Sequence, residues 1–229
     1  MTAGGYRLRR PTGTMVVADR VTSVISSVLA RPALVWWELT GCVEHALREG
    51  FSPYASPSEV IGDWRKRSRA AADRGTRVHK AIAGHLTDTA MVVDDPWTRS
   101  ALRAVNAVLP RPRPLLLVEQ RVSTGAGQIA GTADVLTGDG RVIDWKTCST
   151  LPTSPWLDHE VQVGAYLSLG YLVNDDGTIT AERNPAMRPV LVYIAPEGFR
   201  SFDIHPLRAW NLWSAVRTIH ENKEEEHAC

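Results

Sequence analysis

Three consecutive segments with a β-strand pattern constrain the fold of this chain most. They are Leu115–Ser123, Gln128–Leu136 and Arg141–Thr147. The first connection contains Gly125 and Gly127, and the second is Thr137–Gly140, whose Thr-Gly-Asp-Gly sequence is typical of a β-hairpin. Because short turns join neighbouring antiparallel strands, the sequence predicts a largely antiparallel start to a sheet.

Helical patterns surround these strands. Residues 1–20 suit an irregular or short-strand entry, and helices are then expected at Val21–Leu29, Ala33–Arg48, Glu59–Leu86 and Asp95–Val108. The segment Val21–Leu29 also suits a strand, but Trp36, Trp37 and Leu39 continue its apolar pattern and favour a helix, which Thr22 or Ser23 would cap. After the strands, residues 158–173 are helical in pattern, short strands follow at Val190–Ile194 and Phe199–Ile204, and a helix runs from about Leu207 to Glu221. This order predicts a mixed α/β (α+β) domain.

Length and composition narrow the class of protein. The 229 residues suit one domain, with an N-terminal helical or irregular portion (1–60), a core (61–206) and a C-terminal helix with an acidic tail (207–229). No apolar run reaches the roughly 18 residues of a membrane span, and no apolar run follows Arg7, Arg9 and Arg10 to make a secretory signal. The net charge of +1 means that any nucleic acid must bind through a local patch.

The tripeptide Asp144-Trp145-Lys146 ends the third predicted strand. Strand side chains alternate, so Asp144 and Lys146 share one face. Alone, such a pair is most often a surface ion pair. The neighbouring segment, residues 129–136, is apolar on both faces except for Thr132 and Asp134. A buried acid is costly unless it is paired or binds a metal, so Asp134 and Asp144 become candidates for a shared site.

The hairpin loop decides whether these two acids can meet. A two-residue loop at Asp139-Gly140 would set Asp134 opposite Trp145, with the two carboxylates on opposite faces. A three-residue loop, Gly138 to Gly140, would set Asp134 opposite Asp144 on one face. We predict the odd loop or a bulge. Two such carboxylates would attract Mg²⁺ or Mn²⁺, and Lys146 would orient water or offset charge on a phosphate.

Four separated motifs resemble those of the PD-(D/E)XK nuclease superfamily, in its RecB-like branch of CRISPR-associated and phage-type exonucleases. They are Gly75-Thr76-Arg77-Val78-His79, Gly131-Thr132-Ala133-Asp134, Asp144-Trp145-Lys146 and Gln162-Val163-Gly164-Ala165-Tyr166. The resemblance spans about residues 70–170. It implies a restriction-endonuclease-like core with a central mixed β-sheet flanked by helices, within a single nuclease domain.

The resemblance also implies roles for single residues. The metal ligands would be His79, Asp134, Asp144 and the backbone carbonyl of Trp145, and Lys146 would be the catalytic lysine. The alternative for His79 is a core or surface histidine. The pair Gln162 and Tyr166, one helical turn apart, would support the lysine and the DNA backbone, with ordinary helix packing as the alternative. Glu119 could face either the cleft or solvent, and a solvated strand face is the better interpretation, although the branch often has an acid here.

Two departures from the family pattern are visible. The residue before Asp134 is Ala133 rather than proline, which leaves the ligand set intact. Some relatives bind an iron–sulfur cluster through four cysteines, whereas this chain has three, Cys42, Cys148 and Cys229, without clustering. We therefore expect neither an iron–sulfur cluster nor a zinc site or disulfide framework.

A basic run leads into His79 and is the expected DNA-binding surface. It comprises Arg65, Lys66, Arg67, Arg69, Arg74, Arg77 and Lys80. The alternative is a solvated helix face. Trp36, Trp37, Trp64 and Trp97 are candidates for base stacking, although core packing is the better interpretation for most of them. The acidic tail Glu224–Glu226 should lie away from the cleft or be disordered because it would repel DNA.

The expected function is cleavage of DNA by a metal-dependent nuclease. The resemblance favours an exonuclease acting on single strands in recombination, repair or replication, in a bacterial or phage-infected cytoplasm, with a homo-oligomer or a recombination protein as a possible partner. One alternative is a non-catalytic DNA-binding or assembly module that retains the fold. Another is a metal-dependent hydrolase of a different phosphate substrate, against which the basic run argues mildly.

Overall fold

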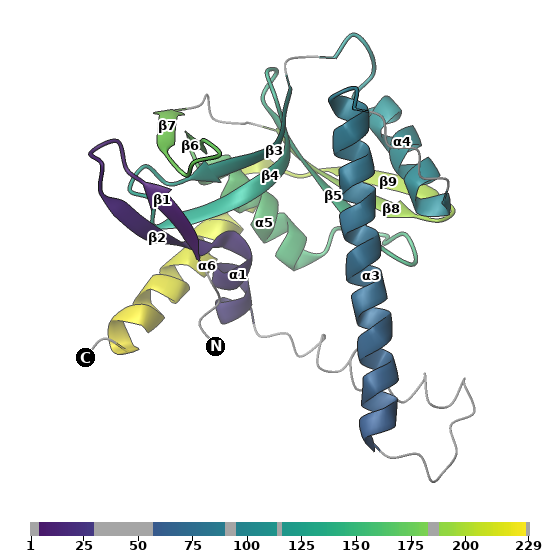
Figure 1. Ribbon diagram of the computed structural model, residues 1–229, viewed down its shortest axis with the longest axis horizontal. Coiled ribbons are helices and arrows are strands. Elements are labelled where there is room, and N and C mark those ends of the chain that lie inside the picture. Colours follow the sequence, from purple (N-terminus) through teal and green to yellow (C-terminus); the bar gives the residue numbers. More distant parts are fainter. Residues whose placement is uncertain (1–4, 30–56, 90–94, 114–115, 183–187, 228–229) are drawn as a thin grey trace. The chain divides into compact units, whose positions relative to one another are not determined.

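The computed structural model describes residues 5–29, 57–89, 95–113, 116–182 and 188–227 (Figure 1). The chain divides into two compact units, one formed by Met1–Leu29 with Val78–Cys229 and the other by Ala30–Arg77. The helix expected at Ala33–Arg48, with Trp36 and Trp37, lies outside the described residues. Among those described, no helix is both long and apolar enough to span a membrane.

A mixed β-sheet forms the centre of the first unit. Its strands are β1 (Tyr6–Arg9), β2 (Met15–Arg20), β3 (Leu116–Ser123), β4 (Ile129–Thr137), β5 (Arg141–Thr147), β6 (Tyr171–Val173), β7 (Ile179–Glu182), β8 (Arg188–Ala195) and β9 (Gly198–Asp203). The order along the sheet is β7-β6-β3-β4-β5-β8-β9, and β2 pairs with both β1 and β4. The meander β3-β4-β5 is antiparallel as predicted, whereas β5 and β8 run parallel.

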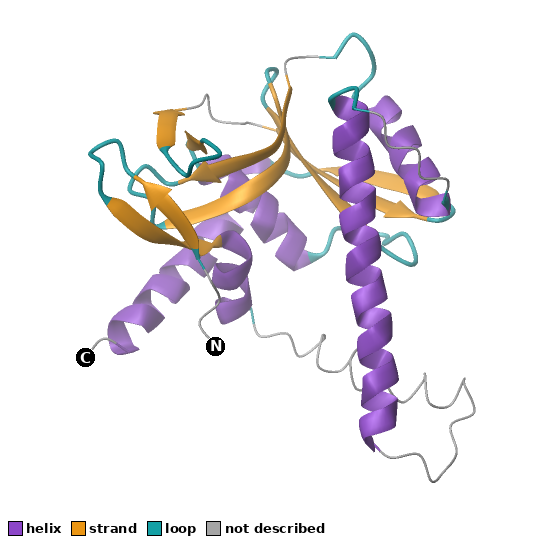
Figure 2. Cartoon of the chain, viewed as in Figure 1, coloured by secondary structure: helices purple, strands orange, loops and turns teal. Residues whose placement is uncertain are grey.

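The described helices are α1 (Val21–Val28), α3 (Pro57–Leu86), α4 (Pro96–Val108), α5 (Leu157–Ser168) and α6 (Pro206–His227). One hydrophobic core packs α1, α5 and α6 against one face of the sheet (Figure 2). A second core packs α4 and the last turns of α3, through Val78, Ile82 and Leu86, against the other face. The predicted mixed α/β class is therefore confirmed, with a central mixed sheet flanked by helices.

Six of the strands close into a ring. The pairs β1–β2, β2–β4, β4–β3, β3–β6 and β6–β7 follow one another, and an isolated bridge joins Arg9 of β1 to Thr178, the residue before β7. A third, small core fills this end of the sheet, with Leu8, Ala130 and Ile179 among its buried members. The ring thus attaches the N-terminal hairpin to β4, the strand that carries Asp134.

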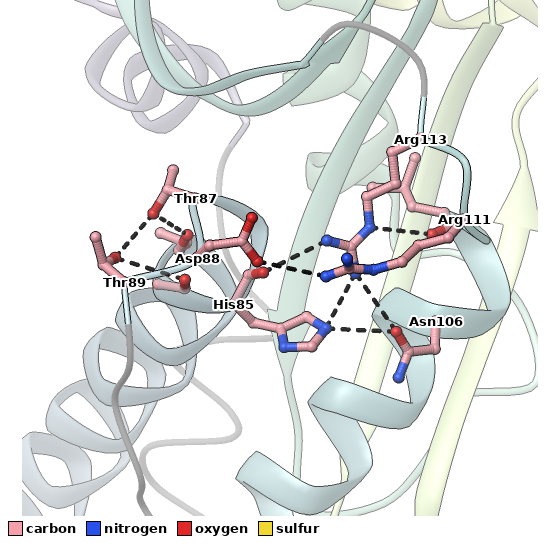
Figure 3. Close-up of polar contacts among 10 residues, drawn as sticks. His85, Thr87, Asp88, Thr89, Asn106, Arg111 and Arg113 are labelled. Carbon is pink, nitrogen blue, oxygen red and sulfur yellow. Dashed lines mark hydrogen bonds and ion pairs between the residues drawn. The ribbon is translucent and has the colours of Figure 1, made fainter.

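The ends of α3 and α4 are joined by one arginine. Arg113 donates to the carbonyl oxygens of Leu109, at 3.3 Å, and His85, at 3.4 Å, and its guanidinium lies 3.0 Å from Nε2 of His85 (Figure 3). A cation at a helix C-terminus satisfies carbonyls that have no partner within the helix. These contacts anchor the part of α3 that carries His79.

Three local predictions were wrong. Arg20 rather than Thr22 or Ser23 is the N-cap of α1, and no side chain caps that helix. The helical pattern of residues 158–173 ends in α5 at Ser168, and the short strands β6 and β7 follow, because strands of three or four residues are too short for periodicity to reveal. The helix α6 continues to His227 rather than ending near Glu221, so Glu224–Glu226 is helical, and its position away from the cleft stays a prediction.

Candidate functional site

The β4–β5 hairpin has the register that the site requires. Val135 pairs with Ile143 and Leu136 with Val142, which corresponds to a three-residue loop and sets Asp134 opposite Asp144. Gly140 has a φ of 84°, a conformation that glycine adopts readily, and its N–H donates to the Thr137 carbonyl oxygen at 3.0 Å. The prediction of an odd loop is confirmed, and the paired residues end at Val135 and Ile143, one position before the two acids.

The strand β4 changes face at Asp134. Ala133 belongs to the core beneath α1, α5 and α6, whereas Val135 belongs to the core beneath α3 and α4. Residues two apart in a regular strand share a face, so the strand is irregular between them. On β3 the residue beside this break is Glu119, whose φ of 50° lies in the left-handed region that side chains rarely adopt. The strands β3 and β4 therefore both depart from regular strand geometry at these two acids.

A histidine, His79, lies close to Glu119 and Asp134 at this irregularity. His79 Nδ1 lies 3.4 Å from Asp134 Oδ1 and 4.0 Å from Glu119 Oε1. One potential ligand atom from each of the three residues lies within 4.8 Å of the other two. They come from α3, β3 and β4, so the tertiary fold alone brings them together.

The electrostatics of this group favour a bound cation. Burial would lower the pKa of His79, but the contact with Asp134 and the charges of Asp134 and Asp144 outweigh it and raise the pKa from 6.5 to about 9. Burial, and then the charge of Asp134, raises the pKa of Glu119. The charge of Asp134 contributes to both shifts, which indicates an excess of negative charge in this partly buried group. Carboxylates with one imidazole are ligands that Mn²⁺ accepts, and the carboxylates also suit Mg²⁺.

Asp144 and Lys146 form a buried ion pair beside this group. Asp144 is 1% exposed, and its Oδ2 lies 2.7 Å from Lys146 Nζ. Burial raises the pKa of Asp144 to about 6, although the lysine opposes that rise. Burial would lower the pKa of Lys146, but the charges of Asp144 and Asp134 raise it instead. The lysine therefore stays a cation inside the site.

The helix α5 completes this chain of contacts. Lys146 Nζ donates to Gln162 Oε1 at 2.9 Å, and Gln162 Nε2 donates to the Tyr166 hydroxyl at 3.1 Å. Both residues therefore face the site, while the buried Tyr166 ring also packs in the core. A Cβ at Gly131 would come within 2.7 Å of that ring, so the strand needs glycine there.

The expected ligands are gathered only in part. The three-residue group contains Glu119, for which the sequence favoured a solvated strand face, and lacks Asp144, whose carboxylate pairs with the lysine. The N–H of Trp145 donates to Asp134 Oδ2 at 2.8 Å, which holds that carboxylate against β5. Coordination by Asp144 and by the Trp145 carbonyl stays a prediction.

Sequence reasoning missed several groups beside the site. The Tyr6 hydroxyl lies 3.2 Å from Thr132 Oγ1, and the Arg20 guanidinium lies 5.4 Å from the centre of the Tyr6 ring. Trp156 and His159, at the start of α5, pack against Tyr193. No motif marks these residues, because they reach the site through strand pairing and helix packing.

The basic run lies on α3. Arg65, Lys66, Arg67, Arg69, Arg77 and Lys80 are exposed, and Arg74 is half-buried. The residues up to Arg77 belong to the unit Ala30–Arg77. The Trp64 side chain lies outside the described set. Trp97 packs against the second core and donates to the Cys148 carbonyl oxygen at 3.2 Å, so its role is structural. DNA binding by the basic run stays a prediction.

No protein-family model matches the chain, and neither does any curated protein. Among solved structures, the crystal structure of SSO0001 aligns with it at 17% sequence identity. The alignment covers 89% of this chain and 74% of that one, with a TM-score of 0.39. That likeness is too weak to carry an argument about function.

Proposed function

We propose that the chain is a metal-dependent deoxyribonuclease with a PD-(D/E)XK active site. One observation carries the proposal. His79, Glu119 and Asp134 converge within 4.8 Å of one another next to a buried Asp144–Lys146 pair. Burying an ammonium and a carboxylate is costly, and a cation with a phosphate substrate gives both groups a use.

Different residues of the site would have different roles in hydrolysis. His79, Glu119 and Asp134 would hold Mg²⁺ or Mn²⁺, with Asp144 as a further carboxylate ligand. The bound ion would supply a Lewis acid for a phosphate oxygen and lower the pKa of a coordinated water. Lys146, held by Asp144 and Gln162, aims a fixed positive charge at the phosphate, where negative charge increases in the transition state.

The proposed substrate is DNA, and the exposed basic residues of α3 support a polymer of phosphates. Attack from an end of a single strand, a role in recombination, repair or replication, and a cytoplasmic setting follow from the resemblance alone. The alternative is a non-catalytic DNA-binding module. It predicts binding without cleavage and gives no role to the buried lysine.

End-labelled single- and double-stranded DNA, incubated with Mg²⁺ or Mn²⁺, tests the proposal. The unchanged protein should cleave, whereas Asp144→Ala and Lys146→Ala should not. Asp203→Asn, which alters an exposed acid at the end of β9, is the matched control and should cleave normally. Equal cleavage by the unchanged protein and Asp144→Ala would assign the activity to another site or a contaminant, and binding without cleavage would favour the module.

A further inference from the structure

Trp156 is an exposed aromatic side chain on a firmly held backbone. It is 45% exposed although it directly precedes α5. The backbone N–H of Trp156 donates to the Tyr193 hydroxyl at 3.0 Å. The Trp156 ring meets the Tyr193 ring edge-on, with centroids 5.4 Å apart. His159, one turn along, lies 5.2 Å from Trp156 between ring centroids. The ring is thus both available to a ligand and restricted in orientation.

Strand pairing connects this aromatic group to the catalytic lysine. Tyr193 of β8 pairs with Lys146 of β5 on one side and with Arg200 of β9 on the other. Paired residues on neighbouring strands point to the same face and lie about 5 Å apart. Lys146, Tyr193 and Arg200 therefore form a row across the sheet, and Trp156 and His159 contact the middle member.

A positively charged residue lies on each side of the aromatic Tyr193 in this row. Arg200 is exposed, and its Nη1 donates to the Pro152 carbonyl oxygen at 2.8 Å, which directs it towards the loop before α5. Lys146 lies at the other end. Asp158, beside Trp156 in the chain, is close enough to add to the raised pKa of Lys146. The negative charge of Asp158 would repel a phosphate placed over the aromatic rings, but it would not repel an uncharged base.

We propose that Trp156, supported by His159, is a stacking platform for one unpaired base of single-stranded DNA, next to the phosphate that Lys146 faces. The inference rests on the proposed function and specifies its substrate class. Bases stack on aromatic side chains whatever their sequence, and a base within a duplex is already stacked and paired. The platform therefore selects unpaired strands, while Lys146 and Arg200 bind the flanking backbone.

Three variants compared on two substrates test the platform. Trp156→Ala should raise KM, and the Kd measured by anisotropy in EDTA, roughly tenfold for a fluorescein-labelled single-stranded oligonucleotide. For a blunt duplex, Trp156→Ala should change KM and Kd much less. Trp156→Phe should retain most of the affinity. Trp210→Ala removes a tryptophan of similar exposure, 49%, from α6 and should match the unchanged protein. Equal melting temperatures would show that all the variants fold.

An abasic scan locates the contact. Single-stranded oligonucleotides that lack one base at successive positions are measured with the unchanged protein and with Trp156→Ala. At one position the abasic substitution should weaken the unchanged protein roughly tenfold and have no further effect on Trp156→Ala. Additive losses at every position would overturn the platform.

The outcomes separate this inference from the function on which it rests. If the unchanged protein cleaves single strands and Trp156→Ala does so with the same KM, the platform is wrong and the nuclease stands. A loss of equal size on single strands and on the duplex also refutes it. If the unchanged protein neither binds nor cleaves DNA, both proposals fall.

Discussion

The two halves of the candidate site differ in their balance of charge. His79, Glu119 and Asp134 form a half-open group in which negative charge is in excess, and the histidine pKa of about 9 reflects that excess. Asp144, Lys146, Gln162 and Tyr166 form a closed chain in which each contact joins a donor to an acceptor. The first half is suited to exchange a proton for a metal ion, and the second is preorganised to hold one cation still.

Removal of the lysine should produce the largest effect. Lys146→Ala leaves the Asp144 carboxylate, 1% exposed, without its partner, so the free energy of unfolding should fall by about 3–5 kcal/mol. Cleavage of end-labelled DNA should fall by a factor on the order of 10³, while calorimetry should find Mn²⁺ affinity nearly unchanged.

A double variant separates stability from chemistry. Asp144→Asn with Lys146→Met removes both charges and should recover much of the lost stability without recovering cleavage. Asp203→Asn, at an exposed acid at the end of β9, is the control and should leave both unchanged. Removal of a positive charge should not weaken cation binding, so a large loss of Mn²⁺ affinity in Lys146→Ala would contradict the assignment of metal binding to the carboxylates and His79.

The pH dependence of metal binding should be the next largest effect. Because the pKa of His79 is raised from 6.5 to about 9, the protonated imidazole stabilises the metal-free fold below pH 6.5, and this contribution disappears as the pH rises through 9. Metal binding needs the neutral imidazole, so apparent Mn²⁺ affinity should rise by about tenfold per pH unit across that window. Melting temperatures with and without Mn²⁺ should therefore diverge as the pH rises. His79→Gln should flatten this trend, and an unchanged trend in that variant would exclude His79 as its source.

A smaller effect should follow at Glu119. Glu119→Gln removes one charged ligand and should weaken Mn²⁺ binding on the order of tenfold in calorimetric titrations, because ligand charge sets the affinity for hard cations. Glu182→Gln, at an exposed acid of β7, is the matched control. Identical affinities for Glu119→Gln and the unchanged protein would place this residue outside the metal group.

The smallest effect should come from the contact between strand and helix. Gly131→Ala places a Cβ 2.7 Å from the Tyr166 ring and 3.1 Å from the Val21 side chain, so thermal or denaturant unfolding should report a loss of about 1–3 kcal/mol. Cleavage should fall a few-fold as Tyr166 moves away from Gln162. Gly170→Ala meets nothing within 4 Å and should be close to neutral. Equal stability of the two variants would show that the Tyr166 ring can shift to accommodate the Cβ without a loss of stability.

The predictions from sequence succeeded where the signal was local. The Thr-Gly-Asp-Gly turn predicted a hairpin, and the requirement that Asp134 and Asp144 share one cation site selected the three-residue loop that the structure has. The helical spacing of Gln162 and Tyr166 was sufficient to place both on one face of α5. Local signals failed for β6 and β7, because each strand is stabilised by its neighbours in the ring rather than by its own pattern.

The sequence by itself determined most of the helices, the hairpin between β4 and β5 and the shared face of Asp144 and Lys146, because the 2-residue period of strands and turn chemistry act over short stretches. Only the tertiary structure decided the rest. The left-handed backbone at Glu119 and the change of face at Asp134 arise where two strands pair around a break, and His79 reaches them from a helix packed on the sheet. Trp156 likewise contacts Tyr193, and only the pairing of β5 with β8 sets Tyr193 beside Lys146. Such contacts depend on packing between distant segments, which no local pattern encodes.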